Sequence, residues 1–379
     1  MISVDYKNCC GCEACVNACP KKCICMEQNS EGFYYPKTDG NACIDCGICN
    51  SVCILENPNL RNIDKLNVYA AYVNNDEIRN NSSSGGVFTV LANYVIENDG
   101  VVYGAAFYDD WTVHHIRIDK KEDLYKIQRS KYVQSHIDSS YSNAKEDLIS
   151  GKKVLFVGTG CQIDGLRLYL GKGYDNLYSV DVVCHGTPSE LVWKKYLSTG
   201  FSKVNNVNFR DKSNGWKKFN VSIGNVKNSF NRDNYMRLFL SNITLRESCY
   251  NCKSKSGYCK SDLTIADFWG IDVIDPDMYD DRGASLVIVN NEKGKTLFDA
   301  ISKDLVYKQE EFDKAVKHNP CVKNSTNRPV DRDKFFYDFL KKDNPDFEKL
   351  VYKYLVYRRS SKVNKLKLTV KRLLKQDVL

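Results

Sequence analysis

Apolar positions along most of this chain fall into short runs, separated by polar turns and by segments with helical spacing. Five runs have the length and apolar content of β-strands: residues 67–73, 101–108, 113–118, 153–158 and 177–183. Helices are predicted at residues 87–97, 163–170 and 188–197, each after a turn. The last begins at a proline, as helices often do. This alternation predicts an α/β domain with helices on the faces of a mixed sheet.

Two cysteine runs of identical spacing precede this α/β region, and each reads C-x2-C-x2-C-x3-C. The spacing is the ligand signature of a bacterial two-cluster ferredoxin, in which three thiolates reach one Fe4S4 cube and the fourth reaches the other. The first cluster is therefore assigned Cys9, Cys12, Cys15 and Cys53, and the second Cys43, Cys46, Cys49 and Cys19. Disulfides or zinc are the alternatives, and single-electron transfer is the interpretation that we favour.

Glycines inside both runs agree with this interpretation. Gly11 and Gly47 leave room for a backbone that wraps closely around a cube. Ile54 replaces the usual proline after the second run, a departure that leaves every ligand in place. We expect residues 1–56 to form a small α+β domain of the bacterial two-cluster ferredoxin type, followed by a linker at residues 57–67.

Later cysteines suggest a further metal site. Cys249 and Cys252 form a C-x2-C pair with Cys259 beyond it, while Cys161 and Cys184 each follow an apolar strand. Loops at the ends of sheet strands are where α/β folds place ligands, so these thiols could converge on a third cube. Structural zinc or free thiols explain the spacing equally well. The other cysteines considered are interpreted as ordinary thiols: Cys10, Cys23, Cys25 and Cys321.

Three further segments bear on cofactor binding. Gly158 and Gly160 follow a strand, but Ile163 stands where the G-x-G-x-x-G fingerprint needs its last glycine, which argues against a dinucleotide site of that type. The Ser/Gly turn at residues 82–86 precedes a helix and offers hydroxyls and amides to a phosphate, although a plain helix cap is the alternative. Residues 129–135 combine cations, a ring and an amide that could clamp a flavin, or they are a solvated helix end.

Taken in order, several motifs resemble a known family. They are Ser83-x-Gly85-Gly86-Val87-Phe88, Ser130 to Ser135, Gly158-Thr159-x-Cys161-Gln162, Asp181-x-x-Cys184-His185-Gly186, and Cys249-x-x-Cys252 through Asp267-Phe268-Trp269-Gly270. This combination resembles the coenzyme F420 hydrogenase/dehydrogenase beta-subunit family, in the bacterial form with an N-terminal two-cluster ferredoxin domain. The resemblance places the family's N-terminal region at residues 68–150, its C-terminal region at residues 151–335 and a basic helical tail at residues 336–379.

The resemblance implies a flavoprotein oxidoreductase that carries FAD beside a [4Fe-4S] cluster. The residues that it implies for cofactor binding are Ser83, Ser84, Gly85, Gly86, Lys131, Tyr132, Gln134, Thr159, Gln162 and His185. The ligands that it implies for a third cluster are Cys161, Cys184, Cys249 and Cys252. Gly160 stands where the family motif is expected to carry proline, and the region around Cys259 is variable.

Three functions remain open at this point. In the first, electrons pass between the clusters and FAD, and from FAD to a hydride or electron acceptor such as a deazaflavin. In the second, the chain is an electron-transfer module for a partner oxidoreductase and has no small-molecule substrate of its own. In the third, the α/β domain is only a scaffold. Expected partners are a ferredoxin or another low-potential redox protein, or a partner oxidoreductase subunit.

Charge and composition restrict the expected partners and the expected cellular compartment of the protein. The net charge of +8 resides in the tail, where ten Lys or Arg residues face one acid from Lys349 onward, so residues 1–348 carry 8 − 9 = −1. Binding to nucleic acid would require a basic face on the folded body, and the near-neutral charge of residues 1–348 gives no indication of one. With 17 cysteines, cubane clusters and no long apolar run, the chain is expected in the reducing cytoplasm.

The tail itself has a helical pattern. Val363, Leu366, Val370 and Leu373 would form one stripe of a helix over residues 361–376, with basic residues on the rest. Such a helix suits an anionic membrane surface at the inner face of the membrane, or an acidic partner. Docking on the protein's own body is the alternative.

Overall fold

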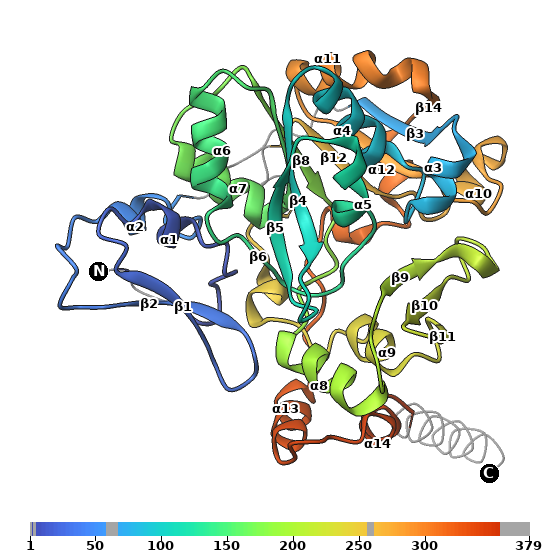
Figure 1. Cartoon of the computed structure of the whole chain (residues 1–379). Helices are drawn as coiled ribbons and strands as arrows, with labels where there is room; N and C mark the ends of the chain where they lie inside the picture. Colours follow the sequence, from blue (N-terminus) through green and yellow to red (C-terminus); the bar gives the residue numbers. More distant parts are fainter. Residues whose placement is uncertain (1, 3–4, 58–66, 256–260, 357–379) are drawn as a thin grey trace, which may run out of the picture.

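The computed structural model describes residues 2, 5–57, 67–255 and 261–356, and Figure 1 shows a central sheet flanked by the N-terminal segment and by a helical base. In the part of the chain that is described, nine strands cross the sheet in this order: β14 (Leu305–Glu310), β3 (Asn67–Val73), β13 (Ser285–Val289), β12 (Leu263–Asp267), β8 (Leu177–Val182), β7 (Val154–Thr159), β4 (Val101–Phe107), β5 (Val113–Ile118) and β6 (Ser135–His136). The central neighbours β12, β8, β7 and β4 are parallel, whereas the pairs toward β14 and the β4–β5 pair are antiparallel. The sheet is therefore mixed, as predicted.

Alternate strand residues point into two apolar layers, one on each face of the sheet. Leu155 of β7 lies in the layer under α4 (Val87–Glu97), α5 (Leu124–Ile127) and α11 (Glu292–Ile301). Phe156 lies in the opposite layer, under α6 (Ser140–Ile149) and α7 (Gly160–Leu170). Farther along that second face, α10 (Ile271–Ile274) and α12 (Phe312–Val316) cover β3 and β13. The helices on both faces confirm the predicted α/β architecture.

The N-terminal segment is small and docks beside α7. It contains α1 (Ala14–Ala18), the antiparallel pair β1 (Ile24–Gln28) and β2 (Tyr34–Thr38), and α2 (Ile48–Ser51), drawn in dark blue in Figure 1. α1 packs on α6 and α7, where Gly165 permits close approach: a Cβ there would lie 3.1 Å from the Cys12 sulfur. The docking brings the first cysteine run to the start of α7. Short helices and one hairpin fit the expected ferredoxin-type domain.

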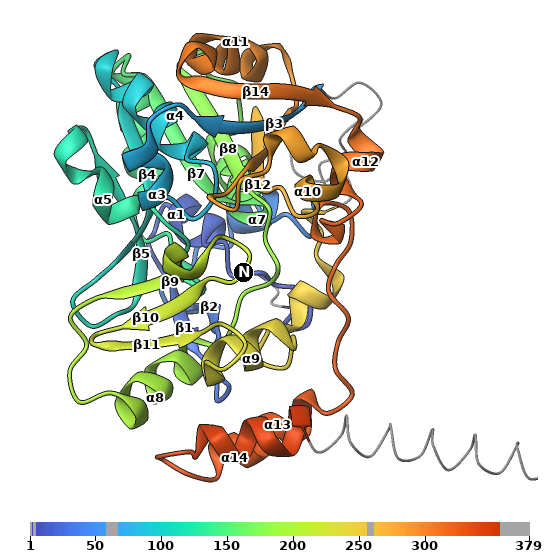
Figure 2. The same ribbon diagram turned by 90° about the vertical axis from the view of Figure 1, so that its right-hand side faces the viewer.

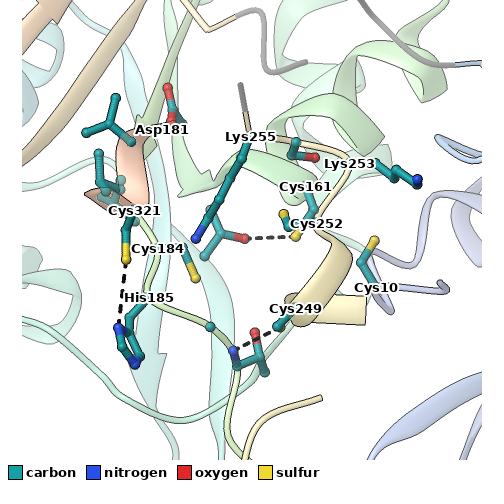
Figure 3. A pocket seen from close by; sticks show the side chains of 18 of the residues that line it. Cys10, Cys161, Asp181, Cys184, His185, Cys249, Cys252, Lys253, Lys255 and Cys321 are labelled. Carbon is teal, nitrogen blue, oxygen red and sulfur yellow. Dashed lines mark hydrogen bonds between the residues drawn. The ribbon is translucent and has the colours of Figure 1, made fainter. Parts of the chain in front are cut away.

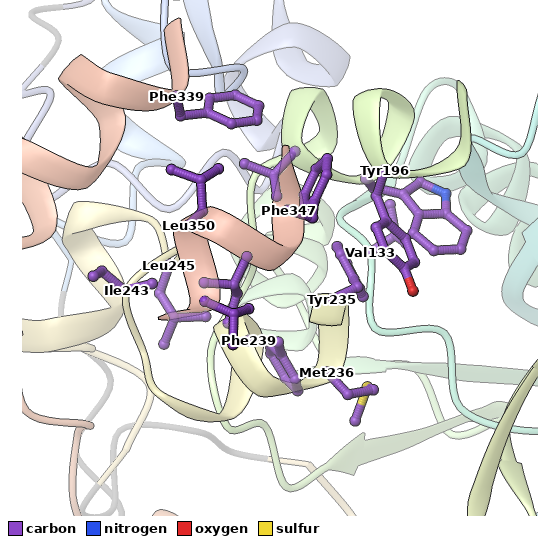
Figure 4. Packing of buried hydrophobic residues seen from close by; sticks show 14 of the residues in the cluster. Val133, Tyr196, Tyr235, Met236, Phe239, Ile243, Leu245, Phe339, Phe347 and Leu350 are labelled. Carbon is purple, nitrogen blue, oxygen red and sulfur yellow. The ribbon is translucent and has the colours of Figure 1, made fainter. Parts of the chain in front are cut away.

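A separate apolar cluster forms the base of the molecule (Figure 4). It joins α8 (Glu190–Gly200), α9 (Asn234–Leu240), α13 (Arg332–Leu340) and α14 (Phe347–Val351), which Figure 2 shows below the sheet. A separate antiparallel sheet of β9 (Val207–Asp211), β10 (Asn220–Ile223) and β11 (Val226–Ser229) packs beside it. Phe33 and Tyr35 of the N-terminal segment are buried in the same cluster, so the base also holds that segment in place.

Most predicted elements are confirmed, and two helix starts are wrong. Residues 67–73, 87–97 and 113–118 coincide with β3, α4 and β5. The helix expected from residue 163 begins at Gly160, because Thr159 and Gln162 form a capping box that the apolar pattern does not register. The helix expected to begin at Pro188 begins after Ser189, whose side chain accepts a hydrogen bond from the Val192 amide.

The chain after residue 335 differs from the predicted tail over its described part. The expected boundary at residue 336 falls inside α13, and Phe336 and Phe339 are buried in the base. Two other expectations, the linker and the amphipathic helix of residues 361–376, lie wholly or mostly outside the described residues. Within the described residues, no helix is both long enough and apolar enough to cross a bilayer.

Candidate functional site

A cavity of about 320 Å³ opens at the carboxyl ends of the central parallel strands. Open α/β sheets place ligands at this edge. We call it the large cavity, and it is lined from four directions: residues 82–84 and 86–89, residues 129–135, residues 157–159 with 161–162, and residues 182–188. Its volume lies at the lower end of the range typical of small-molecule sites.

The Ser/Gly turn forms one wall of the large cavity. Gly86 has a φ of 90°, and a Cβ there would lie 3.0 Å from Val73, so a side chain would be strained and crowded. Ser83 accepts a hydrogen bond of 2.9 Å from the Ser130 amide and thereby ties the turn to the opposite wall. No described side chain caps α4, although the Thr89 amide donates to the Gly86 carbonyl at 3.0 Å. The start of this helix therefore offers its earliest amides to a phosphate. Gly85 differs from expectation: it packs against β3 and β13 and does not line the cavity.

Residues 129–135 form the facing wall. Lys131 lies beside the cavity and donates to the Gln128 carbonyl at 2.6 Å. Burial, with a smaller contribution from the Arg129 charge, lowers the pKa of Lys131 to about 7. Tyr132 stacks on Phe239, with ring centroids 5.0 Å apart. A lysine that is only partly protonated near pH 7 and an aromatic ring therefore border the same cavity.

The remaining predicted cofactor residues have mixed placements. Thr159 and Gln162 line the cavity, but their side chains are engaged in capping α7, and the Gln162 amide donates to the Ser135 carbonyl at 3.1 Å. His185 lies in the wall shared with a second cavity, and its Nδ1 is 3.8 Å from the Cys321 sulfur. Burial lowers the pKa of His185, so the ring is neutral near pH 7.

The second cavity, of about 70 Å³, contains the later cysteines and is called the thiol cavity. Figure 3 shows thiols from separate segments lining it, and four of them form the inner thiol set: Cys161, Cys184, Cys249 and Cys252. Cys161 lies in the first turn of α7, Cys184 follows β8, and the pair comes from the short 3₁₀ helix Glu247–Asn251 and its end. The Thr187 amide donates to the Cys249 sulfur at 3.2 Å.

The inner thiol set has the chemistry of a metal–sulfur site. Burial raises the pKa of Cys184 and Cys249, and it raises that of Cys252 to about 12. A metal that bound these thiols would have to displace their protons. Cys161 is different: the Cys10 thiol is the main cause that lowers its pKa to about 6. Lys255 extends toward the thiols, and its Nζ has no acceptor among the described residues (Figure 3). A buried cation among thiols fits an anionic cluster.

The zinc alternative for these cysteines depends in part on Cys259, which lies outside the described residues. Among the described residues, no three His, Cys, Asp or Glu side chains are placed to share a single metal ion. Thiolates around a cube bind different irons and need not converge on one point.

The two N-terminal cysteine sets also gather in space. The middle thiol set comprises Cys9, Cys12, Cys15 and Cys53, and Coulombic interactions among these thiols contribute to the raised pKa values of Cys9, Cys15 and Cys53. The outer thiol set comprises Cys19, Cys43, Cys46 and Cys49, which together line a third, smaller cavity. Each set draws one cysteine from the other run, which is the crossed arrangement that the spacing predicts. Gly11 of the first run has a φ of 70° and faces the Arg246 guanidinium.

Sequence reasoning missed two residues that connect these parts. Cys10, interpreted as an ordinary thiol, lines both larger cavities, and contacts with Cys12 and Cys161 raise its pKa. Arg246 is fully buried and donates to the Cys9 carbonyl at 2.8 Å, the Gln134 side chain at 3.2 Å and the Tyr34 carbonyl at 2.6 Å. Adjacency to a ligand was the only signal for Cys10, and Arg246 had none. Cys23, 3.4 Å from the Cys19 sulfur, also lines the outer cavity.

Known proteins share parts of this chain. The coenzyme F420 hydrogenase/dehydrogenase family matches it twice: the N-terminal part of the family's beta subunit matches residues 68–141, and the C-terminal part matches residues 151–315. A coenzyme F420-dependent sulfite reductase of Methanocaldococcus jannaschii is 26% identical over 225 residues, 57% of this chain and 34% of that protein. The ketoisovalerate oxidoreductase subunit VorC of Methanothermobacter marburgensis is 38% identical over 52 residues, 13% of this chain and 66% of that protein.

This chain therefore spans about a third of the sulfite reductase and slightly less than two thirds of the VorC protein. Among solved structures, the F420-reducing [NiFe] hydrogenase complex of Methanosarcina barkeri has a chain with a TM-score of 0.46 and 17% identity, covering 76% of this chain and 91% of its own. The two family matches are consecutive and together include nearly all of the central sheet and most of the residues that line both larger cavities. The chain belongs to the coenzyme F420 hydrogenase/dehydrogenase beta-subunit family.

Proposed function

We propose that this chain is an iron–sulfur flavoprotein oxidoreductase that passes electrons between ferredoxin-type [4Fe-4S] clusters and FAD, and from FAD to a hydride or electron acceptor. One observation carries the proposal: the thiol sets and the large cavity form a continuous series. The outer and middle sets share the N-terminal segment, Cys10 contacts both Cys12 and Cys161, and the inner set shares a wall with the large cavity. Such a series suits stepwise electron transfer.

Two walls of the large cavity suit parts of FAD, one its phosphates and the other its ring system. Ser83 and the α4 amides would hold phosphate oxygens, and the helix dipole favours that negative charge. Ser84 donates its hydroxyl proton to the Ala284 carbonyl at 2.8 Å and would hold the turn in place. Tyr132 would lie against the ring system, and Lys131 would lie beside it, where a bound anion would favour its protonated form. Bound FAD would supply the exchange between hydride and single electrons, while the protein positions it. Gly85 would act indirectly, by letting the turn pack on the sheet.

The acceptor is the finer part of the proposal. The name of the M. jannaschii relative includes coenzyme F420, which makes a deazaflavin the first acceptor to test. The second candidate function is an electron-transfer module for a partner oxidoreductase subunit. The outer thiol set favours a redox-protein contact in either case, because one member, Cys46, is exposed and the neighbouring Ile44 is 58% exposed. A ferredoxin is the expected donor.

Anaerobic purification of the full chain, with iron, sulfide and flavin analysis, tests the proposal. Three [4Fe-4S] clusters predict about twelve irons per chain. Near eight irons would remove the inner cluster, zinc in equal amount to protein would replace it with a structural site, and absence of flavin would end the flavoprotein proposal. Reduction of a free deazaflavin would favour the enzyme, whereas activity only with a partner would favour the module.

A paired glycine experiment tests the large cavity. Gly86→Val should abolish most flavin binding, because it strains a positive φ and crowds Val73 beside the proposed phosphate site. Gly151→Val is the matched control: its φ is 87°, but no atom lies within 4 Å of its added Cβ. Equal flavin content in the two variants would show that strain alone, and not a cofactor site, explains the result.

A further inference from the structure

Lys255 is a basic side chain buried among thiols. Its side chain is 9% exposed, it lines the thiol cavity, and its Nζ has no hydrogen-bond acceptor among the described residues. Figure 3 shows the side chain reaching toward Cys184. Its positive charge also acts against the burial that raises the pKa values of Cys184, Cys249 and Cys252. An ammonium in this position needs a nearby negative charge to be stable.

Other cations around the thiols already have partners. Lys323 lines the same cavity and pairs with Asp313 at 2.7 Å. Arg246 directs its guanidinium donors to the carbonyls of Cys9 and Tyr34 and to the Gln134 side chain. Lys253, two residues before Lys255, points away from the thiols in Figure 3. The Asp181 carboxylate, which lines the same cavity, accepts hydrogen bonds from the Ser261 and Thr264 hydroxyls. The Lys255 charge acts on the sulfurs of Cys184, Cys249 and Cys252.

We propose that Lys255 supplies the counter-charge for the cluster held by the inner thiol set and raises the reduction potential of that cluster. The inference rests on the proposed function, since it requires an iron–sulfur cluster at this position. A [4Fe-4S] cluster with four thiolate ligands is anionic and gains one negative charge on reduction, so a fixed positive charge favours the reduced form. Lys255 is thus a positioning and tuning residue and not a ligand.

The electron balance is simple. A low-potential redox protein of the ferredoxin class gives up one electron, the inner cluster accepts it, and no bond forms or breaks. Lys255 exchanges no electron and would act only through its charge. A higher potential at the inner cluster than at the preceding one makes transfer toward the large cavity favourable, and the flavin there accepts the electrons one at a time.

Redox titration of the full chain, followed by electron paramagnetic resonance, tests Lys255 with Lys255→Met and Lys255→Arg. Lys255→Met should change the ratio of reduced to oxidised inner cluster at least tenfold toward the oxidised form, which is 59 mV for a one-electron couple. Lys255→Arg should retain most of the wild-type potential. Lys253→Met is the matched control and should leave the potential unchanged. Lys255→Gln, less apolar than Met, provides the same readout if Lys255→Met does not fold.

The outcomes separate the two proposals. If the wild-type chain contains about twelve irons and the inner-cluster potential is the same in wild type, Lys255→Met and Lys255→Gln, the role of Lys255 is overturned and the proposed function stands. If the wild-type chain lacks an inner cluster, both fail together. A lower potential in the uncharged variants, with iron and flavin contents unchanged, supports the role of Lys255.

Discussion

The outer and inner thiol sets contain the same chemical groups, but they differ in the charged residues near them and in having an exposed member, which only the outer set has. The outer set comes mostly from one short run, Cys46 is exposed, and the Lys21 that borders its cavity is exposed as well. The inner set comes from three distant segments and lies between Arg246, which is fully buried, and Lys255, which is 9% exposed. A low-dielectric site strengthens every charge interaction, so the inner set is electrostatically tuned whereas the outer set is accessible. Accessibility suits electron entry, and tuning suits delivery to the flavin.

The largest expected effect is on the rate of flavin reduction, and it comes from replacing one cysteine in each set. Cys184→Ser should remove about four irons and abolish flavin reduction by a reduced ferredoxin, because the last step before the large cavity is lost. Cys46→Ser should also remove about four irons but only slow that reduction, since the middle set remains available. Stopped-flow bleaching of the flavin under anaerobic conditions measures both.

Cys25→Ser is the control for these variants, because Cys25 is exposed and its sulfur only donates to the Lys37 carbonyl at 3.7 Å. It should match wild type in iron content and rate. Identical rates for Cys46→Ser and wild type would remove the outer set from the electron path. Normal flavin reduction in Cys184→Ser would remove the inner set.

The second prediction concerns the cation between the middle and inner sets. Arg246→Met should lower the free energy of unfolding by about 4 kcal/mol, because carbonyls of Cys9 and Tyr34 lose their charged donor while buried. Arg282→Met, at a guanidinium that is 45% exposed and pairs with Asp280 and Asp76, should cost less than about 1 kcal/mol. Anaerobic urea unfolding compares them, and equal losses would mean that Arg246 does not hold the N-terminal segment.

The same contrast explains what the sequence can predict. The outer and middle sets follow from local spacing, because residues a few positions apart must be neighbours in a tight turn. β3, α4 and β5 follow from apolar periodicity for a similar reason. Arg246 and Lys255 could not be predicted, since their roles depend on Cys9, Tyr34 and Cys184, which folding alone brings near them. The inner set became a specific expectation only through the family resemblance.

The third prediction uses pH to test how the N-terminal segment is held. His136 binds Glu190 at 2.7 Å and lies 3.7 Å from Glu13 of that segment. Burial lowers the pKa of His136, but the neighbouring Glu13 and Glu190 carboxylates outweigh it and raise the pKa to about 9. Because the folded pKa exceeds the unfolded one, the stabilisation is complete below about pH 6.5 and disappears as pH rises through about 9.

His136→Gln measures this stabilisation, since glutamine keeps a hydrogen bond but carries no charge. The unfolding free energies of wild type and variant should differ by about 3 kcal/mol at pH 6 and should converge by pH 10. The neighbouring His114, which stacks on Tyr108 with ring centroids 4.0 Å apart, is unchanged in this variant. A gap that is independent of pH would show that His136 contributes through packing and not through its charge.

The smallest expected effect lies between the sets, at Cys10. Its contacts with Cys12 and Cys161 place it where a ligand could stand, yet it belongs to neither spacing motif. If it only packs there, Cys10→Ala should keep about twelve irons and lose about 1 kcal/mol of stability, the value of a small buried group. Cys321→Ala, at another thiol that lines the thiol cavity, should behave alike.

A loss of about four irons in Cys10→Ala alone would make Cys10 a ligand of the inner cluster, and the inner set would then be partly encoded in the first cysteine run. Iron analysis beside urea unfolding distinguishes these outcomes.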